Sequence, residues 1–180
     1  KRIIQLSKEK DIPVLSFIED VAASGGYWLA CAGNEIFSSK ASIVGSIGVI
    51  SAGFGFNKAI EKLGIERRIY TAGKNKSILD PFSPEKNEDV KKLKNVQNEL
   101  HEQFIDFVKS RRGSKLDNNE KEIFSGSFWS GETAKKIGLV DEIGEMKSVL
   151  KERFGENVKI KEYSPKKKLF DFGNLISVAF

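Results

Sequence analysis

The sequence predicts an α/β fold, because short apolar runs alternate with segments of helical spacing along its 180 residues. The clearest apolar run is 12–18, which follows a charged turn and suits a buried strand. The clearest helix is Glu85–Arg112, where apolar side chains recur every three or four residues. With 39% apolar residues, the chain is long enough for one domain with its own core.

The N-terminal half is predicted to contain short elements joined by tight bends. Lys1–Lys10 has the pattern of an amphipathic helix, and the buried strand follows it. The other expected elements are a small-residue bend at 20–26, a helix at 26–32 ended by Gly33-Asn34, a strand at 35–38, a loop leading into a strand across 43–50, a helix at 57–63 closed by Gly64, and a strand at 66–71.

The C-terminal half is dominated by the long helix, which a loop at 72–84 precedes. Its apolar positions are Val90, Leu93, Val96, Leu100, Phe104, Phe107 and Val108. After it we expect a helix at 131–137, a strand at 138–141, a helix at 146–154 and a strand at 158–163. We predict a main domain over 1–150 and a C-terminal strand and extension over 151–180.

Composition excludes several kinds of site. The single cysteine, Cys31, excludes an internal disulfide and a Cys-cluster metal site, and the single histidine, His101, excludes a His-pair metal site. The longest nearly apolar run, Ile43–Phe56, is broken by glycines and serines and is shorter than the roughly 20 residues of a membrane-spanning helix. The chain begins at Lys1 inside a helical pattern, which predicts a piece of a longer protein whose N-terminal part, with any anchor, precedes it.

One serine has the surroundings of a nucleophile. Ser24 lies between a strand and a helix in the string Ala22-Ala23-Ser24-Gly25-Gly26-Tyr27-Trp28. A tight bend exposes the hydroxyl, small neighbours let a substrate backbone approach, and amides at a helix start can face an oxyanion. The alternative is a serine that caps the helix, followed by glycines for packing.

A nucleophilic serine needs a base. His101 is the only candidate for a Ser-His-Asp triad, but it lies inside the long helix, beside or away from the apolar stripe, so we expect a surface histidine. A lysine can replace it if burial lowers its pKa. Lys74 and Lys76, in the loop after the strand at 66–71, are both candidates, although two lysines in a loop can also simply face solvent.

Three motifs in order resemble the signal peptide peptidase A family of serine peptidases, which includes the SohB-type bacterial peptidases. They are the Ser24 string, Gly45-Ser46-Ile47-Gly48-Val49 and Gly73-Lys74-Asn75-Lys76-Ser77, and Phe128–Asp141 is similar to the closing segment of the family and of the wider ClpP/crotonase fold. The resemblance runs from about Pro13 to Gly144. It implies repeated β-β-α units in a chain that lacks the N-terminal part of the fold.

The resemblance also implies a role for each site residue. Ser24 would be the nucleophile, Lys76 the general base, and Ser46 the residue that orients the lysine. The Gly25 amide would be one oxyanion donor, and the family's second donor lies in a Gly-rich turn upstream of this chain. Lys76 is preferred to Lys74 because the family's lysine comes three residues after the loop glycine, here Gly73.

The expected reaction is peptide hydrolysis through an acyl-enzyme, with no metal or cofactor. The expected substrate is an apolar peptide, such as a remnant signal peptide, held as an added strand with Tyr27, Trp28 and Gly45 at the binding site. The resemblance further implies a ring-like homo-oligomer whose sites are shared between subunits. It places the protein at the bacterial inner membrane, attached through the missing N-terminal segment.

Three other interpretations are weaker. An enoyl-CoA hydratase relative on the same fold would leave Ser24, Ser46 and Lys76 without a role. A catalytically silent family member acting as an assembly or adaptor module would be expected to have lost Ser24 or Lys76. A nucleic-acid module needs a basic stripe interleaved with aromatic residues, whereas the lysines here are spread along the chain. The Lys-rich segment 159–168 suits a solvated tail, and the apolar end, 169–180, suits packing on a neighbour or on a membrane surface.

Overall fold

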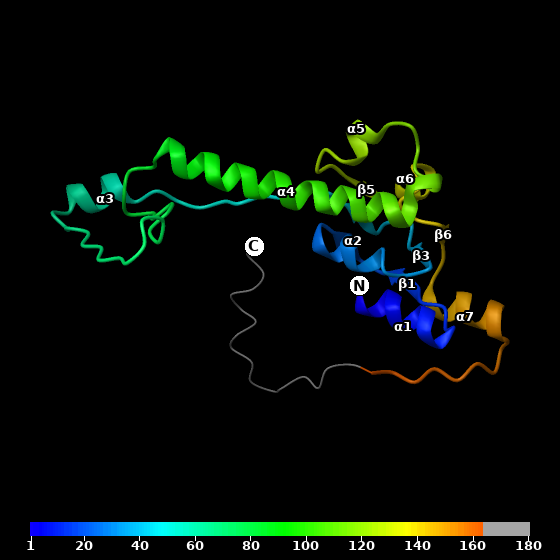
Figure 1. Cartoon of the computed structure of the whole chain (residues 1–180). Helices are drawn as coiled ribbons and strands as arrows, with labels where there is room; N and C mark the ends of the chain where they lie inside the picture. Colours follow the sequence, from blue (N-terminus) through cyan, green and yellow to red (C-terminus); the bar gives the residue numbers. More distant parts are fainter. Residues whose placement is uncertain (164–180) are drawn as a thin grey trace. The chain divides into compact units, whose positions relative to one another are not determined.

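The structure is a computed structural model of the chain, and it describes residues 1–163. The helices are α1 (Arg2–Lys10), α2 (Gly25–Ala30), α3 (Asn57–Lys62), α4 (Asn87–Arg112), α5 (Glu120–Ile123), α6 (Gly131–Lys136) and α7 (Met146–Phe154). The strands are β1 (Leu15–Ile18), β2 (Val21–Ala23), β3 (Glu35–Ser38), β4 (Ile43–Gly45), β5 (Phe128–Ser130) and β6 (Glu142–Ile143) (Figure 1).

The N-terminal elements repeat one pattern. β1, β2 and α2 form a β-β-α unit, and β3, β4 and α3 follow in the same order. β1 pairs in parallel with β3, and β2 pairs in parallel with β4, so each unit gives one strand to each of two small sheets. In the described residues the strand orders are β1-β3-β6 and β2-β4-β5. The predicted α/β class with repeated β-β-α units is therefore confirmed.

Helices α2 and α4 cover the core that the two sheets share. Trp28 of α2 stacks on Phe104 of α4 with their ring centroids 4.5 Å apart. The hydrophobic cluster around this contact contains Ile18, Ala22, Tyr27, Ala30, Cys31, Ile36, Val44, Ile47, Phe104, Val108, Ile123, Phe124, Ala134, Leu139 and Val140. Strands of two to four residues cannot hold a sheet alone, so this burial is what keeps them paired.

The long helix α4 has two different halves. Phe104 and Val108 are buried in the core, but Val96 and Leu100, eight and four residues before Phe104, are exposed. The apolar stripe predicted along the whole helix therefore packs over its C-terminal half. The N-terminal half extends away from the sheets and runs beside the segment that contains α3 (Figure 1).

Residues 49–86 form an arm around α3. Backbone groups in the stretches 49–55 and 66–72 make no hydrogen bond within the described chain, and the side chains there are exposed. Their side-chain contacts include those of Phe54 with Phe56, Arg67 with Asp80 and Arg68 with Glu66. The strand predicted at 66–71 is therefore wrong for this chain, because no strand of residues 1–163 lies beside it to pair with it. The 43–50 segment also differs from the prediction, since the strand comes first and the loop follows.

Two C-terminal strands differ from the prediction. The strand predicted at 158–163 is not formed, and the strand expected at 138–141 is displaced to β6, after a bend at 138–141 that receives the end of α4. Arg112 is 3% exposed, donates from Nη2 to the Gly138 carbonyl at 2.8 Å, and pairs with Asp141 through Nη1 and Oδ2 at 2.6 Å. The bend is fixed by this buried pair instead of by a strand ladder.

The chain divides into two compact units, Lys1–Met146 and Lys147–Phe180. Within the described part, 1–163, no helix has both the length and the apolar character that crossing a membrane requires. The predicted apolar end at 169–180 and the last residues of the Lys-rich segment lie outside the described residues.

Candidate active site

Ser24 occupies a strained turn between β2 and α2. Its backbone angles are φ 52° and ψ −120°, a combination that residues with a side chain seldom adopt. The Ser24 amide donates to the Gly45 carbonyl at 2.8 Å, and the Trp28 amide donates to the Ser24 carbonyl at 3.0 Å, which holds the turn from both sides. Backbone strain of this kind costs roughly 1–3 kcal/mol and tends to persist where function needs it.

The hydroxyl of Ser24 is not used as a helix cap. Ser24 stands at the N-cap position of α2, yet its side chain makes no capping hydrogen bond and is exposed. The alternative of a serine retained to cap the helix therefore lacks the contact that it requires. The turn instead presents a free hydroxyl at a sharp bend from strand to helix, which is the geometry of a nucleophile elbow.

Open space lies beside the two glycines that follow Ser24. A Cβ atom placed on Gly25 or on Gly26 would meet no other atom within 4 Å. The first amides of a helix have no acceptor inside the helix, so the Gly25 amide is available to a developing oxyanion.

Ser46 lies in a matching turn on the neighbouring strand. Ala23 is in register with Gly45, so Ser24 and Ser46 follow directly after paired positions of two parallel strands. Strands in a sheet lie about 4.8 Å apart, so the two serines are neighbours at one sheet end. Ser46 also has a positive φ, of 53°, and its amide donates to the Ser127 carbonyl at 2.7 Å.

Gly45 is fixed by packing on the side away from Ser24. Its φ is +113°, and a Cβ atom on it would lie 2.8 Å from the Trp129 ring. The glycine is therefore needed to let Trp129 of β5 close over β4.

Tyr27 and Trp28, both expected at the substrate, contribute to the core. Tyr27 is fully buried, and its hydroxyl donates to the Leu139 carbonyl at 2.8 Å. Burial raises the pKa of Tyr27 well above its usual value. Trp28 is half-buried between Phe104 and Phe107. The ring of Tyr27 thus has no exposed surface left for a substrate.

Lys76 lies in the arm, and the chain does not bring it to Ser24. The loop that carries Lys76 is tied to α4 by a hydrogen bond from Lys92 Nζ to Asn75 Oδ1 at 2.7 Å. The Ser24 turn lies against α4 through the contact of Trp28 with Phe104. These two points on α4 are twelve residues apart, which corresponds to about 18 Å along the helix. In Figure 1, α2 lies beside the C-terminal half of α4, and the arm lies at its N-terminal end.

Lys76 itself is exposed and borders a shallow cavity of about 320 Å³ with Arg67, Ile69 and Ser77. Its amide donates to the Gly73 carbonyl at 3.2 Å, which closes the turn between the two residues. Lys74, the other candidate, lies in the same exposed turn.

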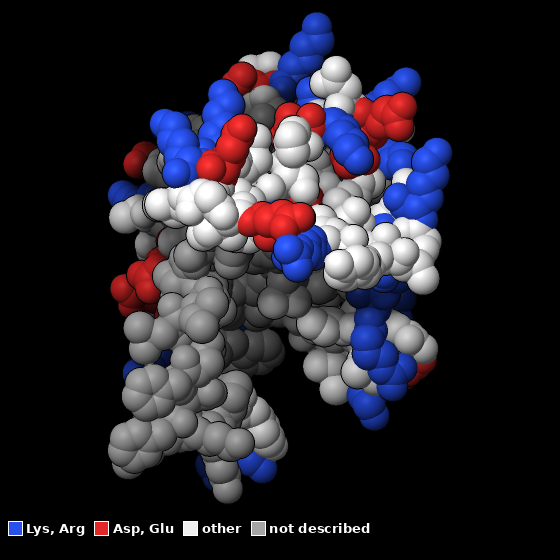
Figure 2. Space-filling view, turned by 90° about the vertical axis from the view of Figure 1, so that its left-hand side faces the viewer, with Lys and Arg blue, Asp and Glu red and all other residues white. Residues whose placement is uncertain are grey.

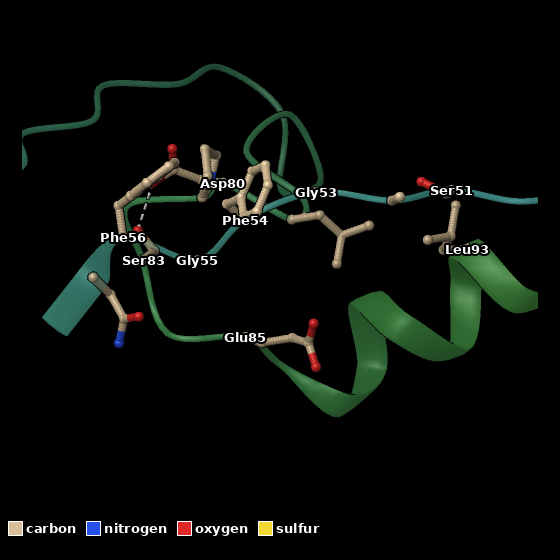
Figure 3. Close-up of a pocket in the computed structure, with 13 residues that line it drawn as sticks. Ser51, Gly53, Phe54, Gly55, Phe56, Asp80, Ser83, Glu85 and Leu93 are labelled. Carbon is tan, nitrogen blue, oxygen red and sulfur yellow. Dashed lines mark hydrogen bonds between the residues drawn. The ribbon is translucent and has the colours of Figure 1, made fainter. Parts of the chain in front are cut away.

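A larger cavity, of about 500 Å³, lies between the extended chain of the arm and the start of α4. Phe54, Phe56 and Leu93 supply its apolar wall, and the Glu85 carboxylate extends into it (Figure 3). Asp80 accepts a hydrogen bond from Ser83 at 2.7 Å, and that bond, with a further one from Arg67, holds the Asp80 pKa below its usual value. A third cavity, of about 410 Å³, lies beside the Ser24 turn and is lined by Ala22, Gly26 and Leu29 among others.

Cys31 and any group of metal-ligating side chains are the other places where a reactive site could form. Burial raises the pKa of the Cys31 thiol to about 11, so the thiolate is disfavoured near neutral pH. Residues 1–163 hold no group of three or more His, Cys, Asp or Glu side chains placed to bind a metal ion.

The prediction that His101 is a surface histidine is wrong. The ring is half-buried, and Nε2 lies 3.0 Å from the Ile47 carbonyl oxygen, next to Ser46. Its place on the same helix face as Phe104, three residues later, is the signal in the sequence that indicates this contact.

Known proteins resemble most of this chain. A Methanocaldococcus jannaschii protein named as a protease is 37% identical over 84% of the chain and 48% of its own length. A Buchnera aphidicola (subspecies Acyrthosiphon pisum) protein named "Probable protease SohB" is 33% identical over 91% of the chain and 48% of its own length. A Brucella abortus protein named Na(+)/H(+) antiporter NhaA is 53% identical over 94% of the chain, but the match covers only 23% of that protein. The chain thus spans half or less of the length of these relatives.

Two solved structures share lower similarity. The membrane-bound stomatin-specific protease 1510-N, in complex with a substrate peptide, has a TM-score of 0.44 and 20% identity over 82% of this chain and 55% of that one. An enoyl-CoA hydratase/isomerase family protein from Hyphomonas neptunium has a TM-score of 0.41 and 18% identity over 83% of this chain and 39% of that one.

The family is decided by sequence. The model of peptidase family S49 matches residues 6–160, which include the three motifs around Ser24, Ser46 and Lys76. The chain belongs to peptidase family S49.

Proposed function

We propose that the protein is a serine endopeptidase in which Ser24 is the nucleophile and Lys76 the general base. The observation that carries the proposal is the strained turn at Ser24, whose exposed hydroxyl makes no capping bond. Ser46 orients the lysine amine, and the Gly25 amide binds the oxyanion. Membership of a peptidase family supports the reaction class.

The reaction proceeds through an acyl-enzyme. The neutral Lys76 amine takes the Ser24 proton as Oγ attacks the peptide carbonyl, and the negative charge collects on the carbonyl oxygen at the Gly25 amide. When the tetrahedral intermediate collapses, the C–N bond breaks and the Lys76 ammonium protonates the leaving amine. Water, deprotonated by the same amine, then attacks the ester and releases Ser24 and the acid.

The active site is completed by a second copy of the chain. Two points on α4, at Lys92 and at Phe104, hold the Lys76 loop and the Ser24 turn about 18 Å apart. The arm carries large exposed apolar side chains, with Phe54 80%, Ile50 87% and Tyr70 90% exposed. Burying them on a neighbour would bring its Lys76 to this Ser24, as expected for a ring-like homo-oligomer with shared sites.

The surface at this end of the molecule favours a protein neighbour. Lys and Arg side chains are interleaved there with Asp and Glu and with uncharged side chains (Figure 2). A nucleic-acid partner would call for a continuous basic stripe instead.

The substrate is an apolar peptide, for example a remnant signal peptide, bound as an added strand. β2 is the edge of its sheet in the described residues, and its far side is open beside the Ser24 turn. The cavity lined by Leu29 beside the Ser24 turn would take an apolar side chain of the peptide. We place the protein at the bacterial inner membrane, attached through sequence outside this chain.

Fluorophosphonate labelling followed by intact-mass measurement tests the dyad. Native protein is expected to gain one adduct, S24A none, and K76A one only very slowly, because Ser24 then has no base. K74A is the matched control and is expected to label at the native rate, since Lys74 lies in the same exposed turn.

Each other result has a definite meaning. Native-rate labelling of K76A would exclude Lys76 as the base, and an adduct on S24A would exclude Ser24 as the labelled residue. Native protein that takes up no label would favour the alternative of a silent family member acting as an assembly or adaptor module.

A further inference from the structure

His101 connects α4 to the turn that carries Ser46. It is the only histidine of the chain and is half-buried, with Nε2 3.0 Å from the Ile47 carbonyl oxygen. A carbonyl oxygen only accepts hydrogen bonds, so Nε2 carries the hydrogen in this contact. The donor is therefore present in the neutral ring with hydrogen on Nε2 and in the imidazolium alike.

The bonded carbonyl belongs to a turn with little freedom. Ile47 is fully buried directly after Ser46, which has a positive φ of 53°. The turn is fastened on the backbone by Ser24 to Gly45, by Ser46 to Ser127 and by Gly48 to Ser46. His101 adds a side-chain hydrogen bond to the carbonyl of Ile47, the residue of this turn that these backbone bonds do not reach. Without that bond, a carbonyl beside a buried residue would lose its partner and the turn would relax.

The same face of α4 contacts the other serine turn. Phe104, three residues after His101, stacks on Trp28. The Trp28 amide in turn donates a hydrogen bond to the Ser24 carbonyl. Residues three apart lie on one face of a helix. One helix face thus contacts the Ser46 turn through His101 and, through Phe104, the helix α2 that follows the Ser24 turn.

We infer that His101 is a positioning residue of the peptidase reaction, which fixes the Ser46 turn beside Ser24 through the Ile47 carbonyl. The inference rests on the proposed function, because Ser46 matters only if it orients the base. Displacement of Ser46 by a fraction of an ångström would misplace the lysine amine that takes the Ser24 proton. The expected loss is in the rate of the chemical step, with substrate binding little changed.

Two nearly isosteric substitutions test the inference in the native protein. H101Q keeps an N–H at the position of Nε2, whereas H101M fills the same space and has no donor. We expect H101Q to label with fluorophosphonate within about twofold of the native rate, and H101M to label roughly tenfold more slowly. With a peptide substrate, H101M is expected to lower kcat and leave KM nearly unchanged.

A second anchor of α4 supplies the control. Arg111 donates to the carbonyls of Cys31 and Gly33 at 2.9 and 2.7 Å, at the far end of α2 from Ser24. R111M is expected to lower the denaturation midpoint and leave the labelling rate unchanged. H101N, whose amide is too short to reach Ile47, provides a second variant without the bond if H101M does not fold.

The inference is overturned if H101Q and H101M label equally fast, or if H101N does so when H101M does not fold. It is also overturned if R111M slows labelling as much as H101M, because loss of α4 anchoring would then explain both. Absence of labelling in native protein would instead count against the proposed function, so the two failures are distinguishable.

Discussion

The serine end and the lysine end of this chain are built in opposite ways. Around Ser24 and Ser46, backbone bonds fasten the turn at successive residues, and α2 and α4 bury the strands beneath. Around Lys76, the stretches 49–55 and 66–72 make no backbone bond within the described chain and expose their side chains, although Phe54, Arg67 and Arg68 make side-chain contacts. The difference indicates that the chain itself fixes the turn of Ser24, the proposed nucleophile. Under the proposed function, the Lys76 loop would be brought to such a turn by contact with a second subunit.

The largest expected effect is complementation between two inactive variants. S24A and K76A should each lose peptidase activity by about a thousandfold or more, because each lacks one member of the dyad. If the site is shared, a subunit that keeps Ser24 can pair with one that keeps Lys76. Co-expression in equal amounts should then restore roughly a quarter of the native activity, since random pairing joins the two intact residues at about one site in four.

The matched measurement uses S24A co-expressed with the double variant S24A/K76A, which has no nucleophile in any subunit and should stay inactive. An inactive mixture of S24A with K76A would contradict the shared site and place both residues of each site in one chain.

The second effect compares one aromatic side chain from each region. Phe104 is 2% exposed and stacks on Trp28, so F104A should lower the free energy of unfolding by about 3–5 kcal/mol. Phe54 is largely exposed, and F54A should lower it by about 0.5 kcal/mol or less in dilute protein. Urea denaturation measures both.

The effect of F54A on subunit assembly can be measured separately. If Phe54 contacts a neighbouring subunit, F54A should weaken assembly in sedimentation experiments although the fold is intact. A large loss of stability in the dilute chain would show that the arm packs on its own core instead.

The sequence predicted the packed region around the serines better than the exposed arm. Strands whose partners lie within the chain, such as 35–38, were predicted with the observed bounds, because burial and pairing act locally. The strand at 66–71 has the same composition signals, but no strand within residues 1–163 pairs with it, and a sequence does not display the absence of a partner. β2 was missed because Val21-Ala22-Ala23 is too short an apolar run, with a single β-branched residue, to indicate a strand.

The site was predictable as residue types and spacing, but not as geometry. The motifs around Ser24 and Ser46 indicated two turns, and the structure places both turns at paired positions of β2 and β4. No local signal distinguishes Tyr27, which is buried, from a pocket residue, because both roles favour a large aromatic ring. The roles of Ser24, Ser46, Gly25 and Lys76 in the reaction stay predictions.

The third effect concerns the acid stability of the contact that Asp141 makes between the end of α4 and β3. Burial alone would raise the pKa of Asp141, but hydrogen bonds from Arg112, Lys115 and the Ile36 amide outweigh it and hold that pKa below its usual value. A lowered folded-state pKa adds stability above the unfolded value of about 4, and that stability is lost as the pH falls through the folded value. Urea stability of native protein should therefore fall as the solution is acidified below about pH 4.

D141N isolates this contribution. Near neutral pH it should unfold more easily by roughly 2–4 kcal/mol, because Arg112 stays buried without a charged partner. Its stability should also fall less steeply below about pH 4 than that of the native protein. An equal acid slope in both proteins would assign the acid sensitivity to other carboxylates.

The smallest effect separates folding from substrate approach at the serine turn. Gly26 lies in α2 with nothing within 4 Å of a Cβ atom, and Gly113 has helical angles and the same open space at the end of α4. G26A and G113A should therefore each stabilise the fold by about 0.4–1 kcal/mol, because alanine loses less backbone entropy. Gly26 lies two residues from Ser24, where a substrate backbone has to come close, so G26A alone should slow peptide hydrolysis. If both variants hydrolyse peptides at the native rate, the open space at Gly26 is not on the substrate side, and the peptide must reach Ser24 from the side of the Ser46 turn.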